Sequence, residues 1–165
     1  MMRSFIRAAE RLATLFGWVA GLLLLATTSL ILFDIAFRKL AGRSTFISQE
    51  YSGYFMAAMV YMAAGYTLLK GEHIRVGLVR ERLGPQGQRI MDLIAGALGT
   101  IFATLLAYAL FKQTHDAWVY GTRSFLPSRT PLVYPYSSAF LGSLVLLTSF
   151  VAFTLKSWLG KEAES

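Results

Sequence analysis

Charged residues are absent from four long stretches of the chain. Residues 12–33, 51–69, 93–111 and 130–155 contain no Asp, Glu, Lys, Arg or His. Each stretch approaches or exceeds the roughly 20 residues that an α-helix needs to cross about 30 Å of hydrocarbon. Four such stretches cannot form the core of one small soluble domain, because too few polar residues remain to cover them.

This pattern predicts an all-α integral membrane protein with four transmembrane helices. We expect one membrane domain over residues 1–165. The helices are expected at about 12–33, 50–70, 91–111 and 130–155. Composition agrees, since 55% of the residues are hydrophobic and only 15% are charged, whereas soluble domains carry about a quarter charged residues.

The distribution of basic residues predicts how the helices are oriented. Ten Lys and Arg residues lie in the N-terminal tail, the middle loop and the C-terminal tail, and six lie in the first and third loops. Loops rich in Lys and Arg stay in the cytoplasm, so both termini and the middle loop are expected there. The net charge of +7 flanks the apolar runs, which favours anionic lipid headgroups over nucleic acid as the binding partner.

Two segments outside the apolar runs are candidates for short helices in the headgroup region. Arg3, Arg7 and Arg11 fall four residues apart in the N-terminal tail and form one stripe of a helix. A frayed basic tail that only fixes the orientation is the alternative. The middle loop, residues 70–90, contains the break "LGPQGQ" and could likewise form an interfacial segment.

Ionisable groups are missing at membrane depth, which excludes several function classes. A carrier that couples solute movement to protons normally needs such a group within the membrane. A haem held by two histidines is also not expected, because His73 and His115 would lie on opposite faces of the bilayer. The chain has no cysteine, and no catalytic grouping, metal-ligand cluster or cofactor motif stands out. We expect neither an enzyme nor a cofactor.

Small residues recur at helical spacing in the expected membrane helices. They let a second backbone approach closely, either within the four-helix unit or from a partner protein, and we favour internal packing. The third helix carries Ala95, Gly99, Ala103 and Ala107, the fourth Ser138 and Gly142, and the second Gly53 and Ala57.

Charged residues at the helix ends have plausible local roles. Asp34 and Arg38 lie four residues apart with the acid first, the favourable order for a helical ion pair. Glu50 would open the second helix and Asp92 the third, where a carboxylate interacts well with the helix dipole. Asp34, Arg38 and Glu50 could equally contact a partner subunit.

Two segments contain most of these features, "LFDIAFRKLAGRSTFISQEYSGYFMAAMVYMAAGYTLLKGEHIRV" and "GTRSFLPSRTPLVYPYSSAFLG", over roughly residues 30–145. Their order resembles the small membrane subunit of tripartite ATP-independent periplasmic (TRAP) transporters. The structural or partner-interface residues that it implies are Asp34, Arg38, Glu50, Gly65, Gly71, His73, Ile74, Arg123, Ser124 and Pro135. The family often has acids where this chain has Gln49 and Gly77, so no role for a carboxylate is expected at those two positions.

The resemblance implies an accessory subunit of a sodium-coupled secondary transporter for organic acids in the bacterial inner membrane. In such systems a periplasmic protein captures the solute, and a large membrane subunit carries the substrate and sodium sites. The small subunit binds the large one and steadies its static part, so it meets the periplasmic protein only indirectly. Alternatives are an autonomous four-helix carrier and a membrane anchor of a redox complex.

Overall fold

The computed structural model describes residues 2–43, 47–70 and 84–159, and within these ranges it is helical with no β-strand. The all-α prediction is therefore confirmed for the described part of the chain. The helices are α1 (Met2–Ala41), α2 (Ile47–Lys70), α4 (Pro85–Val119) and α5 (Val133–Leu159).

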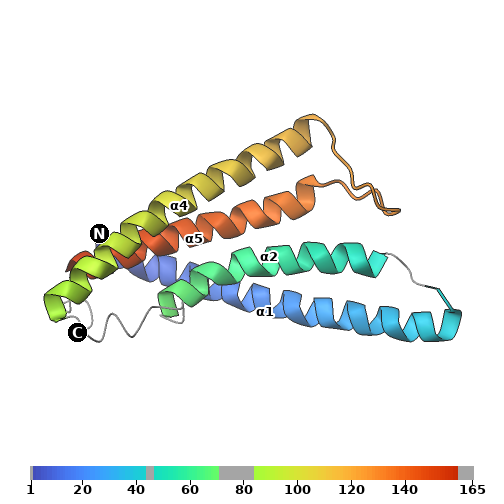
Figure 1. Cartoon of the computed structure of the whole chain (residues 1–165), viewed down its shortest axis with the longest axis horizontal. Helices are drawn as coiled ribbons and strands as arrows, with labels where there is room; N and C mark the ends of the chain where they lie inside the picture. The colour runs from blue at the N-terminus through green and yellow to red at the C-terminus, as the bar shows by residue number, and fades with distance from the viewer. Residues whose placement is uncertain (1, 44–46, 71–83, 160–165) are drawn as a thin grey trace.

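The four helices pack in the spatial order α4, α5, α2, α1 (Figure 1). In this order α4 and α5 run antiparallel, as do α2 and α1, whereas α5 and α2 pack side by side between the two pairs and run parallel. The first part of α1 also contacts α5. The helices converge where α1 begins and α5 ends, and they spread toward the end that carries the loop between α4 and α5. We call that spread end the outer rim.

The N-terminal tail is the first part of α1 rather than a separate interfacial helix or a frayed tail. The α1 helix is continuous over 40 residues, which corresponds to about 60 Å, twice the thickness of the hydrocarbon. Ile6, Ala9 and Ala13 recur on one helical face and are buried, with Ile6 and Ala9 packed against Ala152 of α5. This apolar contact extends the helix far beyond the predicted bounds of 12–33, and the arginines of the stripe stay exposed.

The α4 helix also begins earlier than predicted. Gly84 is its N-cap residue and Pro85 stands in its first turn, where the missing N–H of proline costs no intrahelical hydrogen bond. Asp92 therefore lies in the third turn, and its predicted position in the first turn is wrong. The rest of the middle loop, residues 71–83, lies outside the described residues, as does the interfacial segment predicted there.

Glycines allow the close contacts between α2 and α5. A Cβ atom added to Gly142 of α5 would lie 2.7 Å from the carbonyl carbon of Tyr61 and 2.9 Å from the backbone nitrogen of Met62. A Cβ atom on Gly65 of α2 would lie 2.9 Å from the Ser149 hydroxyl oxygen. The two helices thus approach at a distance that only glycine permits at these positions.

The contact between α4 and α5 confirms the predicted use of small residues for internal packing, but with a shifted face. Ala103 and Ala107 are buried as expected, and an added Cβ on Gly99 would overlap the Phe150 ring. Ala95 is exposed, and Gly96 takes its place against Thr154. The pair Gly53 and Ala57 on α2 is also exposed, so it has no packing role within the described chain.

Three of the four helices are long and apolar enough to cross a membrane, namely α1, α4 and α5. The α2 helix has the necessary length, with 24 residues. It is not among the helices apolar enough to qualify, and its sequence contains four tyrosines and two glycines in place of aliphatic residues. The described residues form four long helices near the predicted positions, and the crossing of the membrane by all four stays a prediction.

Candidate functional site

The outer rim brings together most of the polar residues that the sequence singled out. The first of them are Asp34 and Arg38, near the end of α1. A guanidinium nitrogen of Arg38 donates to a carboxylate oxygen of Asp34 at 2.8 Å, so the predicted ion pair is present. The Asp34 side chain is 8% exposed and that of Arg38 is 62% exposed. The acid is therefore part of the protein interior, and the cation is available at the surface.

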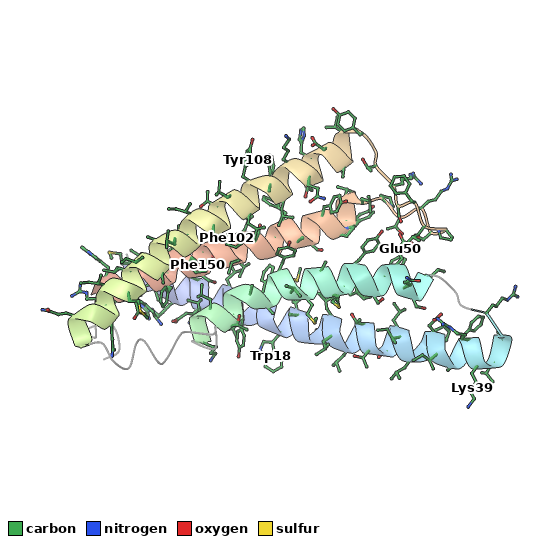
Figure 2. All side chains as sticks on the ribbon, in the orientation of Figure 1. Trp18, Lys39, Glu50, Phe102, Tyr108 and Phe150 are labelled. Carbon is green, nitrogen blue, oxygen red and sulfur yellow. The ribbon has the colours of Figure 1, made fainter. Side chains whose placement is uncertain are left out.

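Glu50 is buried at the start of α2, beneath the loop of residues 120–132 (Figure 2). The Tyr54 hydroxyl, one turn later in α2, donates to one carboxylate oxygen at 2.7 Å, and the Ser128 hydroxyl donates to the other. Ser124 is a further hydrogen-bond partner of this carboxylate. Glu50 thus fastens the loop between α4 and α5 to the first turn of α2.

The loop itself has a defined hairpin-like form. Arg123 and Pro131 form an antiparallel β-bridge, and the Ser124 N–H donates to the Thr130 carbonyl oxygen at 2.9 Å. Gly121 enters the loop with φ 58°, and Arg129 adopts φ 47° near its other end. The left-handed conformation at Arg129 helps to reverse the chain so that Ser124 and Ser128 both face Glu50.

A second hydrogen bond joins the loop to α2. The Thr130 hydroxyl oxygen lies 2.7 Å from the Ser128 hydroxyl oxygen and 3.2 Å from the Tyr51 hydroxyl oxygen, within hydrogen-bond distance of both. Tyr51 and Tyr54 also meet edge to face, with ring centroids 6.0 Å apart. We use the name rim network for Glu50, Tyr51, Tyr54, Ser124, Ser128 and Thr130.

A cavity of about 590 Å³ lies beneath the loop, between α1, α2 and α5. Its walls include the aromatic rings of Tyr51, Tyr54 and Tyr134, while Arg123 and Arg129 line it from the loop. Pro135, in the first turn of α5, also lines it. Proline is tolerated in this first turn because its missing N–H would have no partner within the helix.

The remaining predicted residues are divided between the interior and the surface. Gly65 lies in the contact between α2 and α5, away from the rim, and its role is packing. Arg123 is exposed on the loop. Gly71, His73 and Ile74 lie outside the described residues, so their predicted interfacial role stays a prediction.

Sequence reasoning missed Tyr54 and Ser128 as partners of Glu50, and Tyr51 and Thr130 as further members of the rim network. The signal for Tyr54 was present, because residues four apart in a helix lie on one face. Ser128 is 78 residues from Glu50 in sequence, and no local pattern relates two such positions. Among the described residues no three His, Cys, Asp or Glu side chains gather as possible ligands of a metal ion.

Comparison with protein families gives a match over most of the chain. The family described as "Tripartite ATP-independent periplasmic transporters, DctQ component" matches residues 27–160. Comparison with curated proteins and with solved structures gave no significant match. The matched range includes the whole rim network and both residues of the Asp34–Arg38 pair. The chain therefore belongs to the DctQ family and is a small permease component of a TRAP transporter.

Proposed function

We propose that this subunit steadies the large membrane subunit of its transporter and takes no direct part in binding the solute. The observation that carries the proposal is the placement of its buried acids. Asp34 and Glu50 are the buried ionisable residues of the described chain, and both belong to the outer rim. Between the rim and the converging end, the described helices offer no charged group that could bind a cation or a carboxylate solute at membrane depth.

The polar side chains inside the helices are satisfied locally, which supports the same view. Ser143 and Ser149 are fully buried, and their hydroxyls donate to the carbonyl oxygens of Phe140 and Val145 in their own helix. Thr27 is bonded in the same way to Leu23. Hydroxyls used in this manner stabilise packing in an apolar environment and leave no polar surface for a permeating solute.

The helical layer suits a role as a support. Because the helices lie in one row, each has apolar side chains that no other described helix covers, such as Phe102 and Tyr108 of α4, which are 59% and 68% exposed. We propose that α2 crosses the bilayer with the other three helices, that both termini are cytoplasmic, and that the rim is periplasmic. Lipid and the large subunit would then cover the apolar faces, and Arg38 and Arg123 would be available to the large subunit at the rim.

In this proposal the coupled ion is sodium and the solute is an organic acid, and both are bound by the large subunit. The periplasmic solute-binding protein delivers the solute and meets the small subunit only indirectly. The transporter would reside in the bacterial inner membrane. The carrier chemistry that this chain lacks is thereby supplied by its partners.

Reconstitution tests the proposal. Sodium-driven uptake of an organic acid into proteoliposomes should require this chain, the large subunit and the soluble binding protein together. Vesicles that contain this chain alone should accumulate no solute, although the purified chain should bind the large subunit. Uptake by the lone chain, or full uptake in its absence, would overturn the proposal.

A further inference from the structure

A second cavity, about 510 Å³ in volume, lies at the converging end between α1 and α2. Arg7, Arg11 and Thr14 line it from α1, and Tyr66 and Lys70 line it from the last turns of α2. The α1 positions recur every three or four residues and therefore share one helical face. Two helices thus direct three cationic side chains into one space.

The charges in this cavity are not balanced from within it. Glu10 also lines it, but its carboxylate is ion-paired with Lys156 of α5. Arg11 has no hydrogen bond or ion pair in the described parts of the chain. Arg7 uses only its Nε atom, which donates to the Arg3 carbonyl oxygen at 3.4 Å. Three cations remain, and guanidinium groups bind phosphate oxygens particularly well.

Lys70 is held in position by an aromatic ring. Its ammonium lies over the Tyr66 ring, 5.8 Å from the centroid, in cation–π geometry. The ring in turn packs on α1, where a Cβ atom added to Gly17 would lie 2.8 Å from it. The absence of a side chain at Gly17 therefore lets Tyr66 pack closely against α1, beside Lys70 at the cavity.

Apolar surface adjoins the same cations. A groove of about 660 Å³ on the other side of Arg7 and Arg11 is lined by Leu12 and Leu15. Trp18 follows, 74% exposed and directed away from the other helices (Figure 2). Arg11 and Trp18 are about 10 Å apart along the helix axis. Along α1 the cations are followed by aliphatic side chains and then by an exposed tryptophan. This order matches the change from phosphate to acyl chain at a bilayer surface.

We propose that Arg7, Arg11 and Lys70 bind the phosphate of an anionic phospholipid, with its acyl chains along Leu12, Leu15 and Trp18. The inference rests on the membrane placement given under Proposed function. Free phosphate has the same headgroup chemistry but cannot use the apolar groove. A zwitterionic phospholipid can use the groove, but its own cation opposes the three basic side chains. Binding should therefore be strongest for an anionic lipid.

Native mass spectrometry of the full chain in neutral detergent tests this assignment. The probes are dioctanoyl-phosphatidylglycerol, dioctanoyl-phosphatidylcholine and inorganic phosphate. Phosphatidylglycerol should bind most tightly to the unchanged protein. The triple variant R7Q/R11Q/K70Q should bind it roughly 100-fold more weakly, on the basis of three lost cationic contacts. The matched control K39Q/R43Q/K112Q loses the same charge from exposed sites outside the cavity and should keep the affinity.

Three results would overturn the assignment. In the first, the triple variant and the control lose equal affinity for phosphatidylglycerol. In the second, the unchanged protein binds the two lipids equally tightly. In the third, inorganic phosphate binds as tightly as phosphatidylglycerol. The last result would indicate a site for free phosphate. If the triple variant does not fold, the affinities of the three probes for the unchanged protein still test the assignment. R7K/R11K keeps the charge and should retain most of the binding.

The lipid site and the supporting role can fail separately. Co-purification with the large subunit reports on the supporting role, and the lipid titration uses this chain alone. If lipid binds as expected but the large subunit does not, the supporting role fails and the lipid site stands. If the large subunit binds but the lipids show no preference, the lipid site alone fails.

Discussion

The carboxylate of Glu50 accepts a hydrogen bond from the hydroxyl of Ser128, which lies 78 residues further along the chain. This bond joins the first turn of α2 to the loop that connects α4 with α5. Since α4 packs chiefly on α5, the loop is the connection through which α4 is tied to α2 at the rim. The relationship explains why a buried acid is stable there, because several hydroxyl donors replace the water that it loses.

We predict that Ser128→Ala destabilises the isolated chain. The substitution removes a donor to a buried carboxylate, and hydrogen bonds to charged groups contribute about 1.5 to 3 kcal/mol. The free energy of unfolding in detergent should fall by an amount in this range. Thermal unfolding followed by circular dichroism measures the change.

The control for this variant is Ser137→Ala. The Ser137 hydroxyl donates to the Tyr134 carbonyl oxygen of its own helix at 2.8 Å, in an exposed position. Loss of that local bond should change stability by less than about 0.5 kcal/mol. Equal effects of the two serine variants would contradict the structural role assigned to the rim network.

Arg38→Ala should impair assembly more than stability. In its ion pair with Asp34, the Arg38 side chain is largely exposed. Such a pair contributes about 0.5 kcal/mol or less to the free energy of unfolding. Asp34 also has other interactions, so it is not left as a lone buried charge. We expect a nearly unchanged melting temperature together with weaker co-purification of the large subunit.

Lys39→Ala is the matched control, because Lys39 is also exposed at the end of α1 (Figure 2). This variant should change neither the melting temperature nor the co-purification of the large subunit. Normal co-purification of Arg38→Ala with a changed apparent affinity for the solute would instead place Arg38 in the transport pathway.

Gly142→Ala should disturb the contact between α2 and α5. The added methyl group would lie 2.7 Å from the carbonyl carbon of Tyr61, and backbone atoms cannot move aside as a flexible side chain can. Overpacking of this kind costs about 1 to 3 kcal/mol, which a thermal melt in detergent would show. Gly53→Ala is the control, since its added methyl group meets open space. That variant should be neutral or stabilising by up to about 1 kcal/mol.

Single cysteines can test the proposed orientation, because the natural chain contains none. Phe125 is fully exposed on the loop at the rim, and Ser4 is exposed near the start of α1. A membrane-impermeant maleimide should label Phe125→Cys in intact cells whose outer membrane has been opened. It should label Ser4→Cys only after the inner membrane is permeabilised. The reverse labelling pattern would invert the topology.

The class of fold and the main helices follow from the sequence alone. Long stretches without charge are incompatible with a small soluble core, because no polar surface would remain to cover them. The spacing of Asp34 and Arg38 likewise fixed a local ion pair, since residues four apart in a helix are neighbours. The order of these features also indicated the family that the comparison with family models then showed.

Helix boundaries and packing faces were decided by the tertiary structure. The tail before residue 12 reads as an interfacial helix or a frayed end, yet burial of Ile6 and Ala9 against α5 makes it part of α1. Similarly, Ala95 and Gly96 are equally small, and only the position of Thr154 shows that Gly96 lies at the contact. Periodicity states which residues share a face, but it does not state which face a neighbouring helix will cover.

The rim network contains both kinds of contact, those that a local pattern predicts and those that depend on how the helices pack. Sequence alone placed Glu50 at the start of a helix and left open whether it served the helix or a partner subunit. The structure shows that its partners include Ser128, brought to it by the reversal of the chain at Arg129. A local pattern can encode contacts within a few residues. Contacts between distant segments depend on how the helices pack, which the whole chain determines together.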